Sequence, residues 1–404
     1  MAFECQRNSY KCEFDSKVLS CKISDNKPGL YRIVFDDTIL FPEGGGQPED
    51  LGCLNDSISV LHVEREGDVA VHYTKVPLEE GEHVHMRVNW ERRWDHMQQH
   101  SGQHLITAVI ERKTGYKTIS WCLGVGLDNK CFIELDSNKM SLQQLQDAEE
   151  ECNKLIIQSR AVNVRIIERD SEEFNLVRSR GLPSGSVGPI RVVDMQGVDV
   201  NMCCGTHVSN LSHLQCIKLL HMEQKGTSST LVHFVVGGRV CHQLGRMHAN
   251  ERSLSKLLSC GPEEYGRQIE KISKNQRADA KQNKIYLREI AELTVKNHLS
   301  SPCAVESYFV LHRDDADHEF MSVICNMLLP HKILILLTGG GRKGQGIFLL
   351  SGKDDKLVSE LGPQISAMLE GKGGGRGSRY QGKVQKIELY KVAFEFVKNH
   401  LCTQ

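Results

Sequence analysis

Two pairs of potential metal ligands, each with three residues between its members, constrain this chain more than any other feature. The first pair is His100 and His104, and the second is Cys203 and His207. Residues 94–112 have apolar or small side chains at helical spacing and no proline, so we expect an amphipathic helix there. Residues four apart on a helix share a face, which directs both imidazoles to one side. Because the Cys/His pair can complete a tetrahedral shell, the sequence predicts one Zn²⁺ site joining two distant segments.

Two further residues compete for places in this site. Cys204 is adjacent to Cys203, and only the four-residue spacing from Cys203 to His207, which matches that of the first pair, favours Cys203. His96 lies four residues before His100 and extends the row of histidines. A helix with about 3.6 residues per turn rotates too far for three such imidazoles to meet one ion. We therefore exclude His96 from the predicted shell.

The residue after the first histidine distinguishes this site from those of zinc proteases. Zincins need a glutamate there as general base, whereas this chain has Ser101. Four protein ligands normally form a closed structural zinc site. Catalysis would therefore require a displaceable ligand, or an ion that expands its shell to accept a water or a substrate oxygen.

The composition limits the kinds of partner that the chain can bind. Its 404 residues have a formal net charge of −1, so a nucleic acid would have to be held by a local basic patch. No apolar run approaches the roughly 20 residues that cross a bilayer, and the first ten residues lack the pattern of a secretory signal. We expect a cytoplasmic protein without a membrane segment, whose 15 cysteines are mostly reduced thiols.

The order of patterns along the chain predicts an α+β multidomain protein. Residues 1–90 alternate short apolar runs with turn residues, which is typical of a small antiparallel β-barrel. Residues 91–238 interleave strands with two helices and form the zinc-binding α/β domain. Residues 239–300 have apolar residues at intervals of three and four among many charges, which indicates a helical or coiled-coil arm. Residues 301–404 alternate strands with helices as a small α/β domain.

Three successive glycines lie in the predicted barrel. Gly44, Gly45 and Gly46 precede Gln47, and they allow the backbone to adopt positive φ and to approach a ligand or another element closely. The segment is not a Walker-type phosphate loop, because it lacks the Gly-Lys-Ser/Thr that such a loop needs. A glycine-rich turn at a domain junction is the alternative interpretation.

A second glycine-rich segment interrupts the C-terminal domain. Residues 371–383 contain no acidic residue and carry four cations, Lys372, Arg376, Arg379 and Lys383. We expect a flexible loop whose cations and single tyrosine contact phosphates and single-stranded nucleic acid. The basic residues of the predicted arm are interpreted as a solvated face. The arm and the C-terminal domain are candidate surfaces for homodimerisation.

These motifs together resemble a known family. The two ligand pairs, the Cys-Cys-Gly-Thr-His-Val context of residues 203–208 and the segment 38–47 are similar to the editing domain of alanyl-tRNA synthetases. They resemble still more closely the free-standing alanyl-tRNA editing proteins of the AlaX group, in their long form. Because no class II synthetase catalytic domain precedes the predicted barrel, the resemblance implies hydrolysis in trans.

The resemblance implies a substrate and roles for individual residues. The implied activity is removal of wrongly attached serine, and less often glycine, from tRNA(Ala), with His100, His104, Cys203 and His207 as the zinc ligands. Thr38 would present a hydroxyl to the serine side chain, and Gln47 would lie near the terminal adenosine or the attacking water. Both have structural alternatives, because Thr38 is also a good strand residue and Gln47 could cap the turn.

A second class of function remains open from the sequence. The chain could be a non-catalytic tRNA-binding protein whose zinc holds the fold. The closed four-ligand shell favours this alternative, whereas the combination of Thr38 with Gln47 favours a deacylase.

Overall fold

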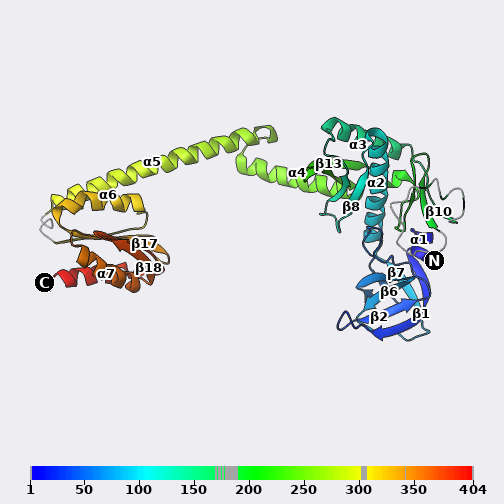
Figure 1. Ribbon diagram of the computed structural model, residues 1–404, viewed down its shortest axis with the longest axis horizontal. Coiled ribbons are helices and arrows are strands. Elements are labelled where there is room, and N and C mark those ends of the chain that lie inside the picture. The colour runs from blue at the N-terminus through cyan, green and yellow to red at the C-terminus, as the bar shows by residue number, and fades with distance from the viewer. Residues whose placement is uncertain are drawn as a thin grey trace. The chain divides into compact units, whose positions relative to one another are not determined.

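The computed structural model describes residues 2–168, 190–301, 307–341 and 343–402, together with residues 171, 174 and 177. The chain separates into two compact units, residues 1–253 and 254–404. Figure 1 draws both units. The division into four domains stays a prediction. Within the described residues, no helix has the length and apolar character that crossing a membrane requires.

The first unit begins with a short helix and a seven-stranded antiparallel sheet. In sheet order the strands are β4, β3, β7, β1, β2, β6 and β5. Their bounds, after α1 (Glu4–Arg7), are β1 (Glu13–Ile23), β2 (Tyr31–Phe35), β3 (Gly52–Leu54), β4 (Ile58–Val60), β5 (His62–Glu66), β6 (Val69–Thr74) and β7 (His83–Val88).

This sheet curls until its edges approach each other. The two edge strands, β4 and β5, are separated along the chain by Leu61 alone. The N–H of Leu61 donates to the carbonyl of Tyr73 on β6 at 2.8 Å. One residue cannot span a flat seven-stranded sheet, whose strands lie about 4.8 Å apart, so the sheet is nearly closed. The structure therefore has a nearly closed sheet in the region where the sequence predicted a β-barrel.

Helix α2 (Trp90–Thr114) follows the sheet and carries the first ligand pair. It begins at Asn89, whose side chain accepts the N–H of Arg92, and ends at Gly115 with φ of 76°. The expected amphipathic character is wrong, because residues 96–110 are buried without interruption. The reason is that other elements contact α2 along its length, among them α3, β9, β12 and β14. Figure 1 shows α2 leaving the N-terminal sheet and passing beside α3.

A buried ion pair fixes the start of α2 to the sheet. Arg93 and Asp50 are both fully buried, and the Arg93 Nε donates to Asp50 Oδ2 at 2.9 Å. The same guanidinium donates to the carbonyls of Ser9 and Ile39. Removing one partner of such a pair leaves an uncompensated buried charge, which is strongly destabilising. The guanidinium of Arg93 therefore holds the ligand-bearing helix against the chain on both sides of the three glycines, at Ile39 and at Asp50.

Two further sheets and a helix follow in the first unit. One sheet has the order β10, β11, β12 and the other the order β13, β14, β9, β8. Ser141 is the N-cap of α3, and it forms a reciprocal capping box with Gln144. The bounds are β8 (Thr118–Cys122), β9 (Cys131–Leu135), α3 (Leu142–Ile157), β10 (Val162–Ile167), β11 (Ile190–Met195), β12 (Asp199–Met202), η2 (Leu211–Leu214), β13 (Ile217–Lys225) and β14 (Ser229–Val236).

Residues 239–300 are predominantly helical, as the sequence predicts. They contain α4 (Gly238–Leu258), η3 (Pro262–Glu264) and α5 (Tyr265–Leu299). The second unit also holds a five-stranded sheet of order β15, β16, β17, β19, β18, in which only the β15–β16 pair is parallel. The bounds are β15 (Tyr308–Arg313), α6 (His318–Leu328), η5 (Leu329–His331), β16 (Leu334–Gly339), β17 (Gly346–Ser351), α7 (Asp355–Met368), β18 (Gly371–Arg376), β19 (Arg379–Val384), η6 (Ile387–Leu389) and α8 (Tyr390–Cys402).

The expected flexible basic loop at residues 371–383 is wrong. These residues form the hairpin of β18 and β19, which turns at Gly377 with φ of 67°. β18 pairs with β19 in continuous register, and β19 pairs in turn with β17. The glycines allow close approach of the strands, since a Cβ added at Gly375 would lie 2.0 Å from the carbonyl oxygen of Arg379. Glycine content was therefore a misleading indicator of flexibility.

Candidate metal centre

The structure brings the two predicted ligand pairs together. The candidate ligand atoms of His100, His104, Cys203 and His207 all lie within 4.8 Å of one another. His100 and His104 come from the middle of α2, and the other two residues come from the segment that follows β12. The three histidines are buried, whereas Cys203 is partly exposed. The cluster is thus enclosed on the α2 side, and Cys203 is its one partly exposed residue.

Two distances within the cluster, both to the Cys203 sulfur, are close to those of a tetrahedral zinc site. Bonds of about 2.1 Å to nitrogen and about 2.3 Å to sulfur would place neighbouring ligand atoms about 3.4 to 3.6 Å apart. The Cys203 sulfur lies 3.4 Å from Nε2 of His100 and 3.2 Å from Nε2 of His207. The ring centroids of the three histidines are 4.5 to 5.1 Å apart. The residues present therefore fit a zinc ion in both donor type and spacing.

The side chain of Gln47 determines which nitrogen of His100 faces the cluster. Its Oε1 accepts the backbone N–H of Thr206 at 2.9 Å, which identifies this atom as the amide oxygen. The same oxygen lies 2.8 Å from Nδ1 of His100. Since an amide oxygen only accepts, Nδ1 must carry the proton. Nε2 then carries the lone pair, and it lies 3.4 Å from the Cys203 sulfur, on the side where metal binding requires it.

Gln47 therefore contacts His100 on the side of the ring that faces away from Cys203. It is completely buried, and its Nε2 donates to the hydroxyl of Thr206 at 2.8 Å. Both functional atoms of the amide are thus used by the protein, and together they join the turn after the three glycines to α2 and to the second ligand segment.

Ser101 is a site residue that sequence reasoning missed. Its hydroxyl oxygen accepts the N–H of Val208 at 3.1 Å and lies 3.0 Å from Nδ1 of His207. Nδ1 is the nitrogen that does not face Cys203, so this contact orients the ring of His207. Burial, and then the nearby His100 and His104, lower the pKa of His207 well below its ordinary value. The imidazole is therefore neutral near pH 7, which is the form that binds metals.

Glycines at two positions make the close packing of the site possible. A Cβ added at Gly205 would lie 2.2 Å from Cε1 of His100, so no other residue fits there without displacing that ring. Gly45, with φ of 61°, would bring a Cβ to 2.8 Å from the Cys204 sulfur. The thiol of Cys204 thus packs against the glycine turn, whereas Cys203 joins the cluster. The glycines approach another element of the protein, as one of the two sequence interpretations expected.

Thr38 lies in the core of the N-terminal sheet. Its side chain is 1% exposed, and its hydroxyl oxygen accepts the N–H of Leu40 at 3.0 Å and lies 2.9 Å from Nε2 of His72. Burial lowers the pKa of His72 to about 4, so this imidazole is neutral near pH 7. None of these partners belongs to the metal cluster.

The four predicted nucleic-acid residues share one face of the C-terminal hairpin. Lys372 is the cross-strand partner of Lys383, and Arg376 is the partner of Arg379. Cross-strand partners lie on the same face, and so do residues four apart on a strand. Arg379 also donates to Asn326. Because like charges directly opposite each other are destabilising, this face would be stabilised by an anion.

Comparisons with known proteins show the family of the chain. A family model described as the threonyl and alanyl tRNA synthetase second additional domain matches residues 190–232, which include Cys203 and His207. The Rattus norvegicus protein named alanyl-tRNA editing protein Aarsd1 is 44% identical over 100% of this chain and 99% of its own length. The chain belongs to the Aarsd1 family of alanyl-tRNA editing proteins.

More distant relatives match over nearly the same part of the chain. The Saccharomyces cerevisiae protein named putative alanyl-tRNA editing protein alaX is 29% identical over 97% of this chain and 95% of its own length. The alanine–tRNA ligase of Pyrococcus furiosus is 27% identical over 96% of this chain, and the match covers 42% of the ligase. The similarity therefore spans the present chain and less than half of a synthetase.

Proposed function

We propose that this chain is a trans-editing hydrolase that deacylates tRNA(Ala) wrongly charged with serine, and less often glycine, at a zinc site. The convergence of His100, His104, Cys203 and His207 at metal-binding distances carries the proposal. The names of the full-length relatives support its substrate class. A synthetase site built for alanine cannot strongly reject an isostere that adds a hydroxyl, so a second hydrolytic site is needed.

The residues of the centre have separate roles in this reaction. When bound, zinc would supply Lewis acidity toward the ester carbonyl or the attacking water. Gln47 holds the proton of His100 on Nδ1, and Ser101 fixes the ring of His207. Arg191 donates to the carbonyl of Cys203 at 2.6 Å and so holds the backbone of the second ligand pair. The partly exposed side at Cys203 is where we expect the acylated 3′ end to approach.

Thr38 is proposed to discriminate serine from alanine through its hydroxyl. Replacing Thr38 with valine should lower the ratio of seryl-ester to alanyl-ester hydrolysis about tenfold, the value of one hydrogen bond of about 1.4 kcal/mol. The ratio is measured on one enzyme preparation, so a general loss of stability affects both substrates alike. Thr38→Ser keeps the hydroxyl and should keep the ratio. An unchanged ratio in Thr38→Val would remove this residue from the selectivity of the site.

The C-terminal hairpin is proposed to bind the tRNA. The cationic face formed by Lys372, Arg376, Arg379 and Lys383 supports this role, because repulsion between its paired charges is relieved by phosphates. A cytoplasmic location and a homodimer formed through the helical arm or the C-terminal domain also stay proposals.

The alternative is a non-catalytic tRNA-binding protein with a structural zinc. The complete four-ligand set favours it, since closed shells are typical of structural sites. One assay separates the two functions. Purified protein is incubated with seryl-tRNA(Ala), and the release of free serine is followed. Catalytic turnover supports the deacylase, and tRNA binding without turnover supports the alternative.

A further inference from the structure

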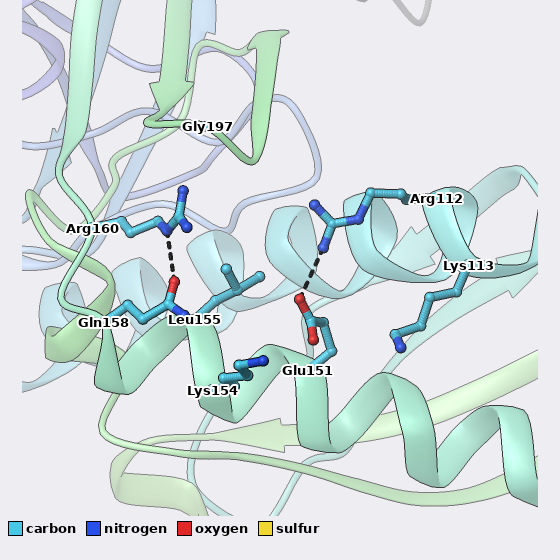
Figure 2. Close-up of a pocket in the computed structure, with 8 residues that line it drawn as sticks. All are labelled: Arg112, Lys113, Glu151, Lys154, Leu155, Gln158, Arg160 and Gly197. Carbon is cyan, nitrogen blue, oxygen red and sulfur yellow. Dashed lines mark hydrogen bonds and ion pairs between the residues drawn. The ribbon is translucent and has the colours of Figure 1, made fainter.

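We propose that a basic hollow in the first unit binds a backbone phosphate of the RNA substrate. This hollow, named here the α2–α3 hollow, lies between the last turns of α2 and α3 and the turn that joins β11 to β12 (Figure 2). Its volume is about 390 Å³, within the range of pockets that hold small ligands. The inference rests on the proposed function, because it concerns how the same RNA is held.

The charge of the hollow favours an anion. Four cations line it, Arg112, Lys113, Lys154 and Arg160, against the single carboxylate of Glu151, which gives a formal charge of +3. The whole chain has a net charge of −1, so this charge is local. Two helix C-termini lie here, and each contributes about −0.5 charge. When the −1 of the two helix ends is added to the +3 of the side chains, a net positive charge of about +2 remains in the hollow.

The contacts of the four cations leave them available to a ligand. Lys113 and Lys154 are exposed, and the side-chain ammonium group of neither forms a hydrogen bond or ion pair with a residue that the structure describes. Arg112 donates to Glu151 at 3.2 Å, and these side chains are 48% and 26% exposed. Such a pair contributes little to stability, so Arg112 can exchange Glu151 for a phosphate. Figure 2 shows Arg112 reaching from α2 toward Glu151 on α3.

Arg160 is held in place on the opposite side of the hollow. Its Nε donates to Gln158 at 2.9 Å, and its Nη1 donates to the carbonyl of Gln196 at 3.2 Å. The turn leaves room for this guanidinium because residue 197 is glycine, where an added Cβ would lie 2.6 Å from Nη1. A preorganised guanidinium loses little entropy when it binds a phosphate.

The hollow is connected to the metal centre through both ligand segments. Arg112 follows His104 by eight residues on α2, which corresponds to about 12 Å along the helix axis. On the other side, β12 leads from the turn at Gly197 directly to Cys203. An RNA whose acylated 3′ end lies at the cluster carries backbone phosphates over distances of this order. An RNA phosphate is therefore favoured over a free small anion as the occupant.

The test compares tRNA binding by the full-length protein with that of a double variant, Lys113→Ala with Lys154→Ala. We expect the Kd for tRNA(Ala) to rise about tenfold. The slope of log K against log[salt] should decrease in magnitude by about 1.4 to 1.8, the value for two lost phosphate contacts. A matched control, Lys75→Ala with Lys139→Ala, removes two exposed lysines of the same unit outside the hollow and should leave both quantities unchanged. Glu151→Gln should instead tighten binding.

The outcomes separate this inference from the proposed function. Unchanged tRNA affinity and salt slope in the Lys113/Lys154 variant would overturn the inference. The inference would also be overturned if the wild-type protein binds adenosine 5′-monophosphate or inorganic phosphate tightly and the variant loses this binding but still binds tRNA as the wild type does. Wild-type protein that binds tRNA through these lysines without releasing serine would overturn the deacylase alone. Wild-type protein that binds no tRNA would overturn both.

Discussion

Replacing Cys203 with alanine will lower the rate of seryl-tRNA(Ala) hydrolysis by about 10³-fold or more. The thiolate is the only anionic member of the ligand set, and its sulfur lies 3.2 to 3.4 Å from two of the three imidazoles. A metal ion contributes several kcal/mol to stabilising transition-state charge, and about 4 kcal/mol corresponds to about 10³-fold. The measurement is single-turnover release of serine, with metal content determined on the same sample.

Cys204→Ala is the matched control for this substitution. It removes the neighbouring thiol, which packs against Gly45 and lies outside the cluster. The variant should retain its metal and most of its activity. Wild-type turnover in Cys203→Ala, or equal losses in both variants, would contradict the assignment of Cys203.

Replacing Gln47 with alanine will weaken metal binding about 10- to 100-fold, the usual cost of losing a residue that orients a ligand. Without the amide oxygen, the Nδ1 proton of His100 and the N–H of Thr206 both lose their acceptor. A buried donor without an acceptor costs about 1 to 3 kcal/mol, so the free energy of unfolding should fall by a similar amount. Metal affinity is measured by competition with a chelator, and stability by denaturant unfolding.

The variant Gln47→Glu tests whether Gln47 acts by positioning His100 through its acceptor oxygen or only by filling space in the core. A carboxylate can still accept from His100 and from Thr206, so this variant should bind metal nearly as well as the wild type. If Gln47→Ala binds metal with unchanged affinity, Gln47 does not position His100. If Gln47→Glu fails as Gln47→Ala does, the amide acts by some means other than its acceptor oxygen.

The features that the sequence predicted correctly depend on local periodicity and on fixed spacing. The helical character of residues 239–300 was predicted correctly, because apolar residues at intervals of three and four are a property of neighbouring residues. The two ligand pairs were found because spacing alone brings residues to one side of a helix or turn. The choice of Cys203 over Cys204 needed only the same spacing, and the geometry of the cluster agrees with it.

The features that were missed depend on contacts between distant segments. Nothing in the sequence near Gln47 shows that its amide lies against Thr206, 159 residues away. Ser101 was noted only because it is not glutamate, whereas its contact with His207 required the fold. The continuous burial of α2 and the pairing of the glycine-rich strand β18 with β19 likewise arise from partners elsewhere in the chain.

The central claim is that a metal held by the cluster of His100, His104, Cys203 and His207 enables hydrolysis of a mischarged tRNA. The most direct measurement is the rate of serine release from seryl-tRNA(Ala) by wild-type protein before chelation, after chelation, and after one molar equivalent of Zn²⁺ is restored. We predict turnover before chelation, its loss in the metal-free protein, and its recovery with one zinc per chain. Full turnover by folded protein shown to be free of metal would contradict the claim.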